Sequence, residues 1–166
     1  MVEVKNDGKI VLNGVDSNFN LKELVPKQVY NYFGVNAIWF LDPDLLHLLQ
    51  FMRIYFEQSM KINDWSYGGT MQYRGFRPDP FYYDKQEDGT YKDKRKGKYS
   101  QHRYGRAIDC SFSKMSAEEA RQEIMANEEM WLDAGLTTIE DGAYSPTWLH
   151  FDIRNTGLNN IKVVKP

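Results

Sequence analysis

Two histidines and one aspartate in this chain are spaced so that they could bind a metal ion together. His102 and Asp109 lie seven residues apart, and His150 follows far downstream. Two imidazoles and one carboxylate from separate segments supply three positions of a tetrahedral zinc site and leave the fourth for water. This is the ligand set of a zinc hydrolase. In the alternative interpretation, both histidines are ordinary hydrogen-bonded residues and Asp109 is a surface or capping carboxylate.

The segments around these residues predict how they are positioned. Gly105 permits a tight turn or a positive φ after His102. Residues 107–112 alternate as a half-buried strand does, and residues 147–153 form a second such strand. If the two strands are neighbours, Asp109 and His150 lie side by side, and the alternate residues of the second strand face the core.

Six residues form a composite motif: Ser100, His102, Gly105, Ala107, Asp109 and His150. This motif resembles the pattern S-x-H-x-x-G-x-A-x-D, with a downstream H, of a family of zinc peptidases. The family includes D-alanyl-D-alanine carboxypeptidases, D-Ala-D-Ala dipeptidases, phage L-alanyl-D-glutamate endopeptidases and the hedgehog signalling domain. The resemblance implies that Zn²⁺ is bound by His102, Asp109 and His150, and that the substrate is a peptide of bacterial peptidoglycan.

An arginine upstream of the motif also resembles a family feature. Residues 73–78 are similar to the family's G-Y-R element, whose arginine reaches into the active site, and Arg77 is the matching residue. A guanidinium there could bind a developing oxyanion or a substrate carboxylate. The alternative is a surface arginine that precedes the turn-forming Pro78.

The general base departs from the family pattern. Many members carry Glu or Asp three residues before the final histidine, but here that residue is Thr147, which cannot accept a proton from water. We predict that Glu140 takes this role, because residues 136–140 read as a strand that returns toward His150. Asp141 is the fallback. Glu140 could instead be a solvated residue at the end of a strand.

Three further residues are expected around the site. Trp148 lies on the strand face of His150 and either walls the pocket or belongs to the core. Asp152, on the same face, is expected to orient a ligand histidine or an arginine. Ser100 is expected to form a hydrogen bond within the His102 loop.

Length and composition indicate one domain over residues 1–166, of which about residues 17–155 carry the resemblance. The net charge of −2 gives no basic footprint for nucleic acid, and no apolar run is long enough for a membrane span. The first residues lack the apolar segment of a signal peptide. We therefore expect a protein that is cytoplasmic until release, or phage-encoded, and that acts on the cell wall. The sequence leaves the oligomeric state open.

The remaining pattern predicts an α+β, hedgehog/DD-peptidase-like domain whose small, mainly antiparallel sheet is flanked by helices. The expected elements are an N-terminal hairpin, a short helix capped by Asn20, a long helix from residue 42 to about 60, a helix from Ser116 to about residue 134, and an edge strand at 161–164. The long helix contains His47, which we interpret as structural. The lone Cys110 is expected to be a buried thiol.

Residues 77–102 carry many tyrosines and charges of both signs. Gly89 and Gly97 within them indicate a surface excursion, with or without a hairpin. Because both ends adjoin proposed site residues, the excursion is either a rim or lid over the cleft or a solvated loop.

Two functions fit this sequence. The first is a zinc-dependent metallopeptidase that hydrolyses a peptide bond in peptidoglycan stem peptides. The second is a zinc-containing binding module of the same fold that has no catalytic activity and binds cell wall or protein. Thr147 favours the second, and Glu140 is the residue on which the first depends.

Overall fold

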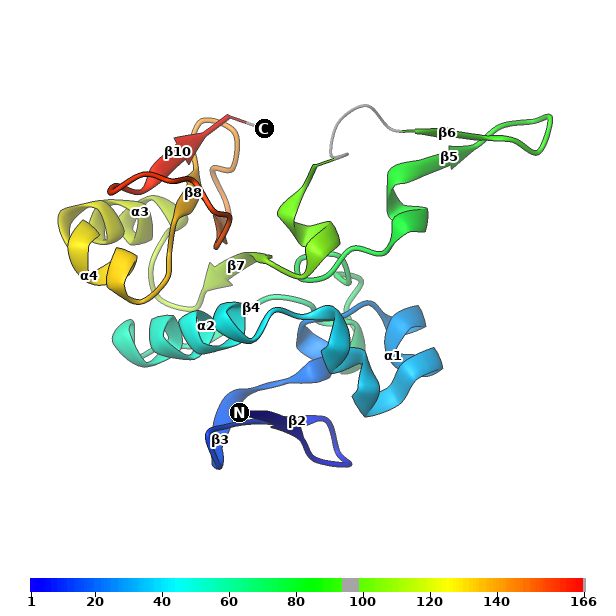
Figure 1. The fold of residues 1–166 in the computed structure, drawn as a ribbon, viewed down its shortest axis with the longest axis horizontal. Coiled ribbons are helices and arrows are strands. Elements are labelled where there is room, and N and C mark those ends of the chain that lie inside the picture. The colour runs from blue at the N-terminus through cyan, green and yellow to red at the C-terminus, as the bar shows by residue number, and fades with distance from the viewer. Residues whose placement is uncertain (94–98, 166) are drawn as a thin grey trace.

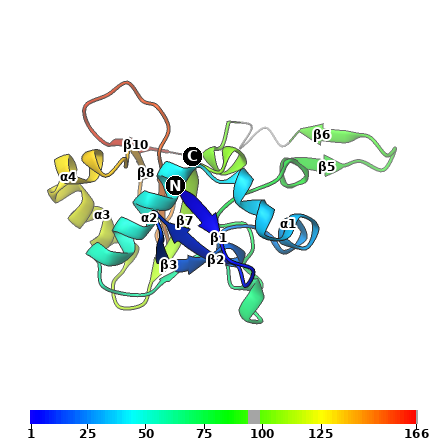
Figure 2. The ribbon, with the colours of Figure 1, turned by 60° about the horizontal axis from the view of Figure 1, so that its bottom comes forward.

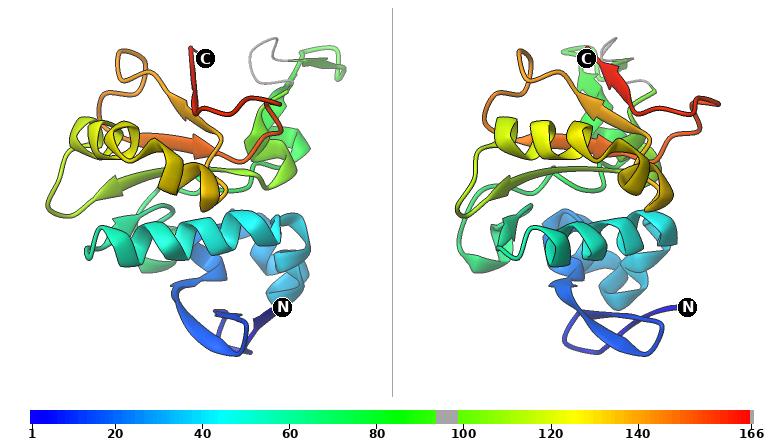
Figure 3. Two further views of the ribbon diagram at one scale, coloured as in Figure 1. Left: turned by 60° about the vertical axis from the view of Figure 1, so that its left-hand side comes forward. Right: turned by 90° about the vertical axis from the view of Figure 1, so that its left-hand side faces the viewer.

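The structure is a computed structural model that describes residues 1–93 and 99–165. Its elements form an N-terminal sheet, a helical layer and a C-terminal sheet that is covered in part by two further helices (Figures 1 and 3). The two ends of the chain lie on opposite sides of the molecule (Figure 1). The architecture is α+β, with a small, mostly antiparallel sheet and several helices, as the sequence predicts.

The N-terminal sheet has three antiparallel strands: β1 (Val2–Val4), β2 (Lys9–Leu12) and β3 (Val15–Asn20). The predicted hairpin is its first two strands, and β3 was not predicted. Asn20 then caps the chain as expected, because its side chain accepts from the Lys22 N–H while the Glu23 carboxylate accepts from the Asn20 N–H. The capped segment is one 3₁₀ turn, since Pro26 restarts the chain as a new helix.

The helical layer contains two 3₁₀ segments and the helices α1 and α2, of which α2 lies between the two sheets (Figure 3). These elements are η1 (Leu21–Glu23), α1 (Lys27–Phe33), η2 (Gly34–Phe40) and α2 (Pro43–Tyr55). Five residues of α2 are buried and place the main core between helix and sheet: Leu45, Leu46, Leu48, Leu49 and Met52. Helix α2 starts where Asp42 caps it, as predicted.

The predicted end of this helix was wrong. The chain leaves the helix after Tyr55, and Glu57 takes a positive φ of 51°. Met60 then pairs with Phe112, so that Met60–Lys61 forms strand β4. Pairing with a strand outside the local sequence therefore determines this boundary, which helical periodicity alone does not reveal.

The C-terminal sheet carries the site and has the strand order β10-β8-β9-β7-β4. Its remaining strands are β7 (Ala107–Phe112), β8 (Thr138–Glu140), β9 (Leu149–Asp152) and β10 (Lys162–Val164). All neighbours pair antiparallel except β8 and β10, which are parallel. The predicted strands are thus confirmed, with β10 at an edge. On one sheet face Ile108, Phe151 and Ile139 are buried in the core.

Two helices, α3 (Ala117–Ala126) and α4 (Glu128–Asp133), occupy the stretch for which one helix was predicted. The capping box of Ser116 and Glu119 begins α3 as expected. The break comes at Asn127, whose side-chain amide donates to the Glu123 carbonyl oxygen at 3.1 Å and so competes with the helical backbone.

The excursion between the site segments contains a hairpin that projects from the body of the molecule (Figures 1 and 2). Its strands are β5 (Tyr83–Lys85) and β6 (Tyr91–Asp93), and the short 3₁₀ turns η3 (Trp65–Tyr67) and η4 (Asp79–Tyr82) precede it. Gly97 lies outside the described residues. Within the described ranges, no helix is long and apolar enough to cross a membrane.

Candidate metal centre

One row of side chains crosses the C-terminal sheet and forms the floor of the site. Asp109 on β7 pairs directly with His150 on β9, as predicted. The register between β8 and β9 pairs Ile139 with Phe151, so that one further step brings Glu140 opposite His150. Val164 of β10 pairs with Glu140 and completes the row. Because alternate residues share a face, the whole row lies on the sheet face opposite Ile139 and Phe151.

His102 approaches this row from the 3₁₀ turn η5 (Gln101–Tyr104). The turn ends at Gly105, which has a φ of 65°, and a Cβ there would lie 1.8 Å from the Phe40 carbonyl oxygen. Glycine is therefore required both by conformation and by space, which confirms the turn expected at this position. It lets the chain reverse from His102 into strand β7.

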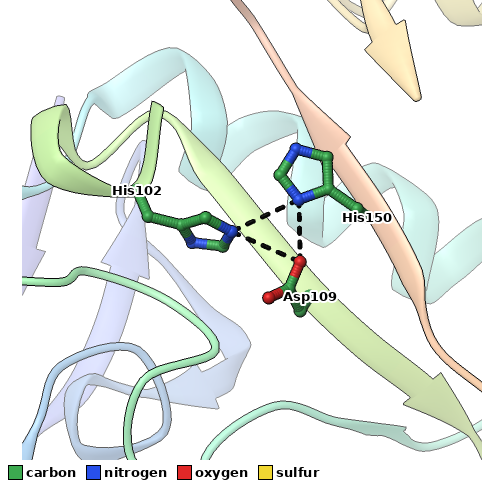
Figure 4. A group of neighbouring side chains, drawn as sticks. All are labelled: His102, Asp109 and His150. Atoms are coloured by element: carbon green, nitrogen blue, oxygen red, sulfur yellow. Dashed lines mark hydrogen bonds and ion pairs between the residues drawn. The ribbon is translucent and has the colours of Figure 1, made fainter. Parts of the chain in front are cut away.

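The three predicted ligands form one buried cluster (Figure 4). His150 Nδ1 lies 2.7 Å from Asp109 Oδ1, and His102 Nε2 lies 3.3 Å from both Asp109 Oδ1 and His150 Nδ1. Each residue is less than a tenth exposed. Three donor atoms from three segments thus point at a common centre.

Hydrogen bonds behind the rings determine which nitrogen faces that centre. His102 Nδ1 lies 2.7 Å from the Gly75 carbonyl oxygen and donates to it, which leaves Nε2 for the cluster. The segment that carries Gly75 is held beside β7, because Asp109 N–H donates to the Arg74 carbonyl oxygen. His150 Nε2 lies 3.3 Å from Asp152 Oδ2, which leaves Nδ1 for the cluster. Asp152 is therefore placed as expected for a residue that orients a ligand.

The charges of the cluster follow from burial and from these contacts. Burial lowers the pKa of His102, which keeps its ring neutral. Burial alone would raise the pKa of Asp109, but its contacts with His102 and His150 lower it well below the ordinary value. Burial likewise opposes a charge on His150, yet its hydrogen bonds to Asp109 and Asp152 raise its pKa to about 9.

The donor set fits a divalent metal ion. Zinc binds nitrogen and carboxylate oxygen at about 2.0–2.1 Å, so tetrahedral ligand atoms lie about 3.3 Å apart. Two of the three separations in the cluster are 3.3 Å. A buried group of His102, Asp109 and His150 could therefore hold a metal ion, and these three residues would be its ligands.

A cleft of about 640 Å³ opens over the cluster. Seven of the residues that line it are candidates from the sequence: Arg77, Ser100, Glu140, Trp148 and the ligands His102, Asp109 and His150. Asp141 does not line this cleft; its carboxylate accepts from the Ala143 N–H in the turn after β8. Thr147 is exposed on the same connection.

Arg77 lies at the edge of the cleft, where its Nη2 donates to Asp109 Oδ2. Its Nε donates to the Tyr73 carbonyl oxygen at 2.6 Å, and its guanidinium carbon lies 5.3 Å from the centre of the Phe81 ring. One oxygen of Asp109 therefore faces the histidines and the other faces Arg77. This fixes the guanidinium beside the cluster.

Glu140 differs from Asp109 because its carboxylate has no hydrogen-bond partner within the described residues. Its side chain is 9% exposed and lines the cleft. Among the residues that the structure describes, none forms a hydrogen bond or ion pair with this carboxylate. A carboxylate in that situation is available to accept a proton from water in the cleft.

Ser100 and Trp148 both line the cleft. Trp148 is half-buried, which favours the pocket-wall interpretation over the core. Ser100 precedes η5, but its side chain makes no capping hydrogen bond there. Ser100 takes part in the His102 loop through its backbone, because its carbonyl oxygen accepts from the Arg103 N–H at 3.1 Å.

Arg154 and Tyr144 are among the residues that line the cleft and that the sequence did not single out. Arg154 Nε lies 2.9 Å from Asp152 Oδ1, and this contact, with the hydrogen bond from His150, lowers the pKa of Asp152 to about 2 although burial opposes it. Continued alternation after Asp152 could have identified Arg154, because the two residues share a strand face. His47 and Cys110 behave as expected: His47 lies on α2 away from the cluster, and Cys110 is buried.

Comparison with models of protein families, with curated proteins and with solved structures finds no match to this chain.

Proposed function

We propose that this protein is a zinc-dependent metallopeptidase that hydrolyses a peptide bond in the stem peptides of bacterial peptidoglycan. The observation that carries the proposal is the position of the His102, Asp109 and His150 cluster at the base of a cleft that also contains the free carboxylate of Glu140. Ligands, an acceptor for a proton and a fixed guanidinium are the parts that such a hydrolysis requires.

Zinc is the proposed metal because two imidazoles and one carboxylate are a zinc ligand set that leaves an open position. Bound there, zinc would polarise the scissile carbonyl and lower the pKa of water. The same residue types also bind Fe²⁺ in oxygenases. Metal analysis of the protein as purified separates the two: zinc supports the proposal, and stoichiometric iron contradicts it.

Each remaining residue has a role that its position supports. Glu140 accepts the proton of the attacking water and returns it to the leaving amine. Arg77, fixed by Asp109 and Tyr73, donates to the developing oxyanion or to a substrate carboxylate. Trp148 walls the cleft and limits access of bulk water.

Peptidoglycan as the substrate, and the hedgehog/DD-peptidase fold in particular, come from the motif of Ser100, His102, Gly105, Ala107, Asp109 and His150. The sheet geometry supports this, since the motif places Asp109 and His150 opposite each other on adjacent strands. A protein of this kind would act on the cell wall after release from the cytoplasm or as a phage product.

The test uses purified full-length protein, loaded with zinc, on peptidoglycan preparations of differing stem composition. We expect new amino termini or released amino acids, loss of this activity with a chelator, and recovery with zinc. Inert behaviour toward every preparation, in protein that holds zinc, would overturn the proposal.

The second candidate function is a zinc-containing binding module, which is favoured by the exposed Thr147 at the position where related peptidases carry an acid. Glu140→Gln separates the two candidates. A peptidase loses about 10²–10⁴-fold in rate when its general base is removed, whereas a binding module keeps its affinity for wall or protein. Asp141→Asn is the matched control, because Asp141 neighbours Glu140 but caps a turn outside the cleft.

A further inference from the structure

A buried arginine on α3, Arg121, lies beneath the connection between β8 and β9. It is 5% exposed, and its Nη1 lies 3.5 Å from Oε2 of Glu118, whose own side chain is exposed. A charge is costly to bury without partners. The other partners of Arg121 are oxygen atoms of the connection itself.

These oxygen atoms mark the beginning, the middle and the end of the connection. Arg121 Nε donates to the Glu140 carbonyl oxygen at 3.0 Å. Its Nη2 lies 2.6 Å from the Ser145 carbonyl oxygen, 2.7 Å from Ser145 Oγ and 2.6 Å from the Trp148 carbonyl oxygen. One guanidinium thus ties both strand ends and the loop between them to α3.

The connection is shaped to meet this side chain. The backbone at Gly142 approaches α3 closely, since a Cβ there would lie 2.6 Å from Glu118 Oε2 and 3.2 Å from Arg121 Nη1. Ser145 is fully buried, and its hydroxyl oxygen lies 3.4 Å from the Asp141 carbonyl oxygen, to which it donates. The fixed donor fork of an arginine suits several carbonyls at once, which a lysine cannot match.

Glu140 and Trp148, the two ends held by Arg121, are also residues of the cleft. The Glu140 carboxylate has no partner of its own in the described part of the chain, so its place depends on its backbone. We infer that Arg121 is a positioning residue, which holds Glu140 and Trp148 over the metal centre by binding their carbonyl oxygens. This inference rests on the proposed function, because it assigns Arg121 a role through the general base.

A double-mutant cycle tests the inference on full-length, zinc-loaded protein with soluble stem peptides released from wall. Arg121→Met should lower kcat about 10- to 100-fold, as loss of a supporting contact does. It should leave zinc stoichiometry at one, since Arg121 touches none of the ligands. In the Glu140→Gln background the same substitution should change kcat by no more than about twofold, because the group that it positions is already removed.

Arg106→Met is the matched control. Arg106 also donates to a backbone oxygen next to β9, the Ile153 carbonyl at 2.7 Å, but it does not contact the connection. Its effect on kcat should be the same in both backgrounds. If Arg121→Met does not fold, Arg121→Lys and Ser145→Ala enter the cycle in its place, with bound zinc as the measure of an intact site.

The outcomes separate the two proposals. Equal losses from Arg121→Met with and without Glu140→Gln, or loss of zinc from the single variant, overturn the positioning role and leave the peptidase intact. Full activity of Glu140→Gln would show that Glu140 is not the general base, and it would overturn the positioning role of Arg121 as well. Absence of activity in the parent protein overturns the peptidase and, with it, this inference.

Discussion

Two acidic residues on one face of the sheet, Asp109 and Glu140, differ in the hydrogen bonds that their carboxylates form. Oδ1 of Asp109 on β7 accepts from His150 Nδ1 and lies 3.3 Å from His102 Nε2, and its Oδ2 accepts from Arg77. Glu140 on β8 lies in the same row, yet within the described residues its carboxylate forms no hydrogen bond or ion pair. The strand between them carries His150, so the two acids flank one imidazole.

One face of the sheet thus carries two carboxylates that suit different chemical roles. A carboxylate with partners on both oxygens has a lowered pKa, stays ionised and is oriented, which is what a metal ligand requires. A carboxylate without partners in a cleft can exchange protons with water.

Removal of a ligand should have the largest effect. His150→Ala or His102→Ala is expected to reduce zinc affinity by more than the roughly 100-fold that loss of a supporting residue can cost, because the donor atom itself is gone. Zinc content after dialysis, measured by elemental analysis, should fall from one per chain to near zero. His47→Ala is the control and should keep its zinc; equal loss in this variant would show that the site lies elsewhere.

Neutralising the two acids should affect stability unequally. In protein freed of metal by a chelator, Asp109→Asn is expected to lower the free energy of unfolding by about 3 kcal/mol, since it leaves Arg77 and His150 without their shared carboxylate. Glu140→Gln should change it by no more than about 0.5 kcal/mol. Urea denaturation of both variants measures this. Similar losses in the two would show that Glu140 is held by contacts as Asp109 is.

Asp152 should have a smaller effect on the metal than the ligands do. Asp152→Asn keeps the shape of the side chain but weakens its hold on His150 Nε2, so zinc affinity should fall about 10- to 100-fold while the stoichiometry stays at one. Competition with a chromophoric chelator gives the affinity. Asp133→Asn at the end of α4 is the control, and a loss there as large as at Asp152 would contradict the orienting role.

The parts of the site that depend on strand alternation could be predicted from the sequence. Alternation around Asp109 and around His150 predicts both strands and their shared face, and the structure pairs the two residues directly. The turn at Gly105 could also be predicted from the sequence, because a positive φ there favours glycine.

The contacts that support the ligands could not be predicted in this way. The Gly75 carbonyl oxygen that orients His102, and the carbonyl oxygens that gather around Arg121, meet their partners only in the folded chain. A backbone oxygen has the same chemistry at every residue, so no sequence pattern marks it. The end of α2 at Tyr55 also depends on a contact that forms only in the folded chain, the pairing of Met60 with β7.

The smallest effect expected is the pH dependence of zinc binding, about tenfold in affinity for each pH unit. His150 has its pKa raised from 6.5 to about 9 by Asp109 and Asp152, so near neutral pH the metal-free ring carries a proton that zinc must displace. His102 has its pKa lowered by burial and contributes no second proton there, and Asp109 is already ionised. Affinity should therefore rise with pH from about 7 and level off above about 9.

The raised pKa of His150 also makes the stability of the metal-free protein depend on pH. Because the folded pKa of His150 exceeds its ordinary value of 6.5, its contribution to the stability of metal-free protein is complete below 6.5 and is lost as the pH rises through about 9. Calorimetry of zinc binding in buffers of different ionisation enthalpy counts the protons released. Near pH 7.5 the count should be about one; zero would mean that His150 is neutral and that Asp109 and Asp152 do not hold a proton on its ring. In Asp152→Asn the affinity should level off at a lower pH, because one of those carboxylates is gone.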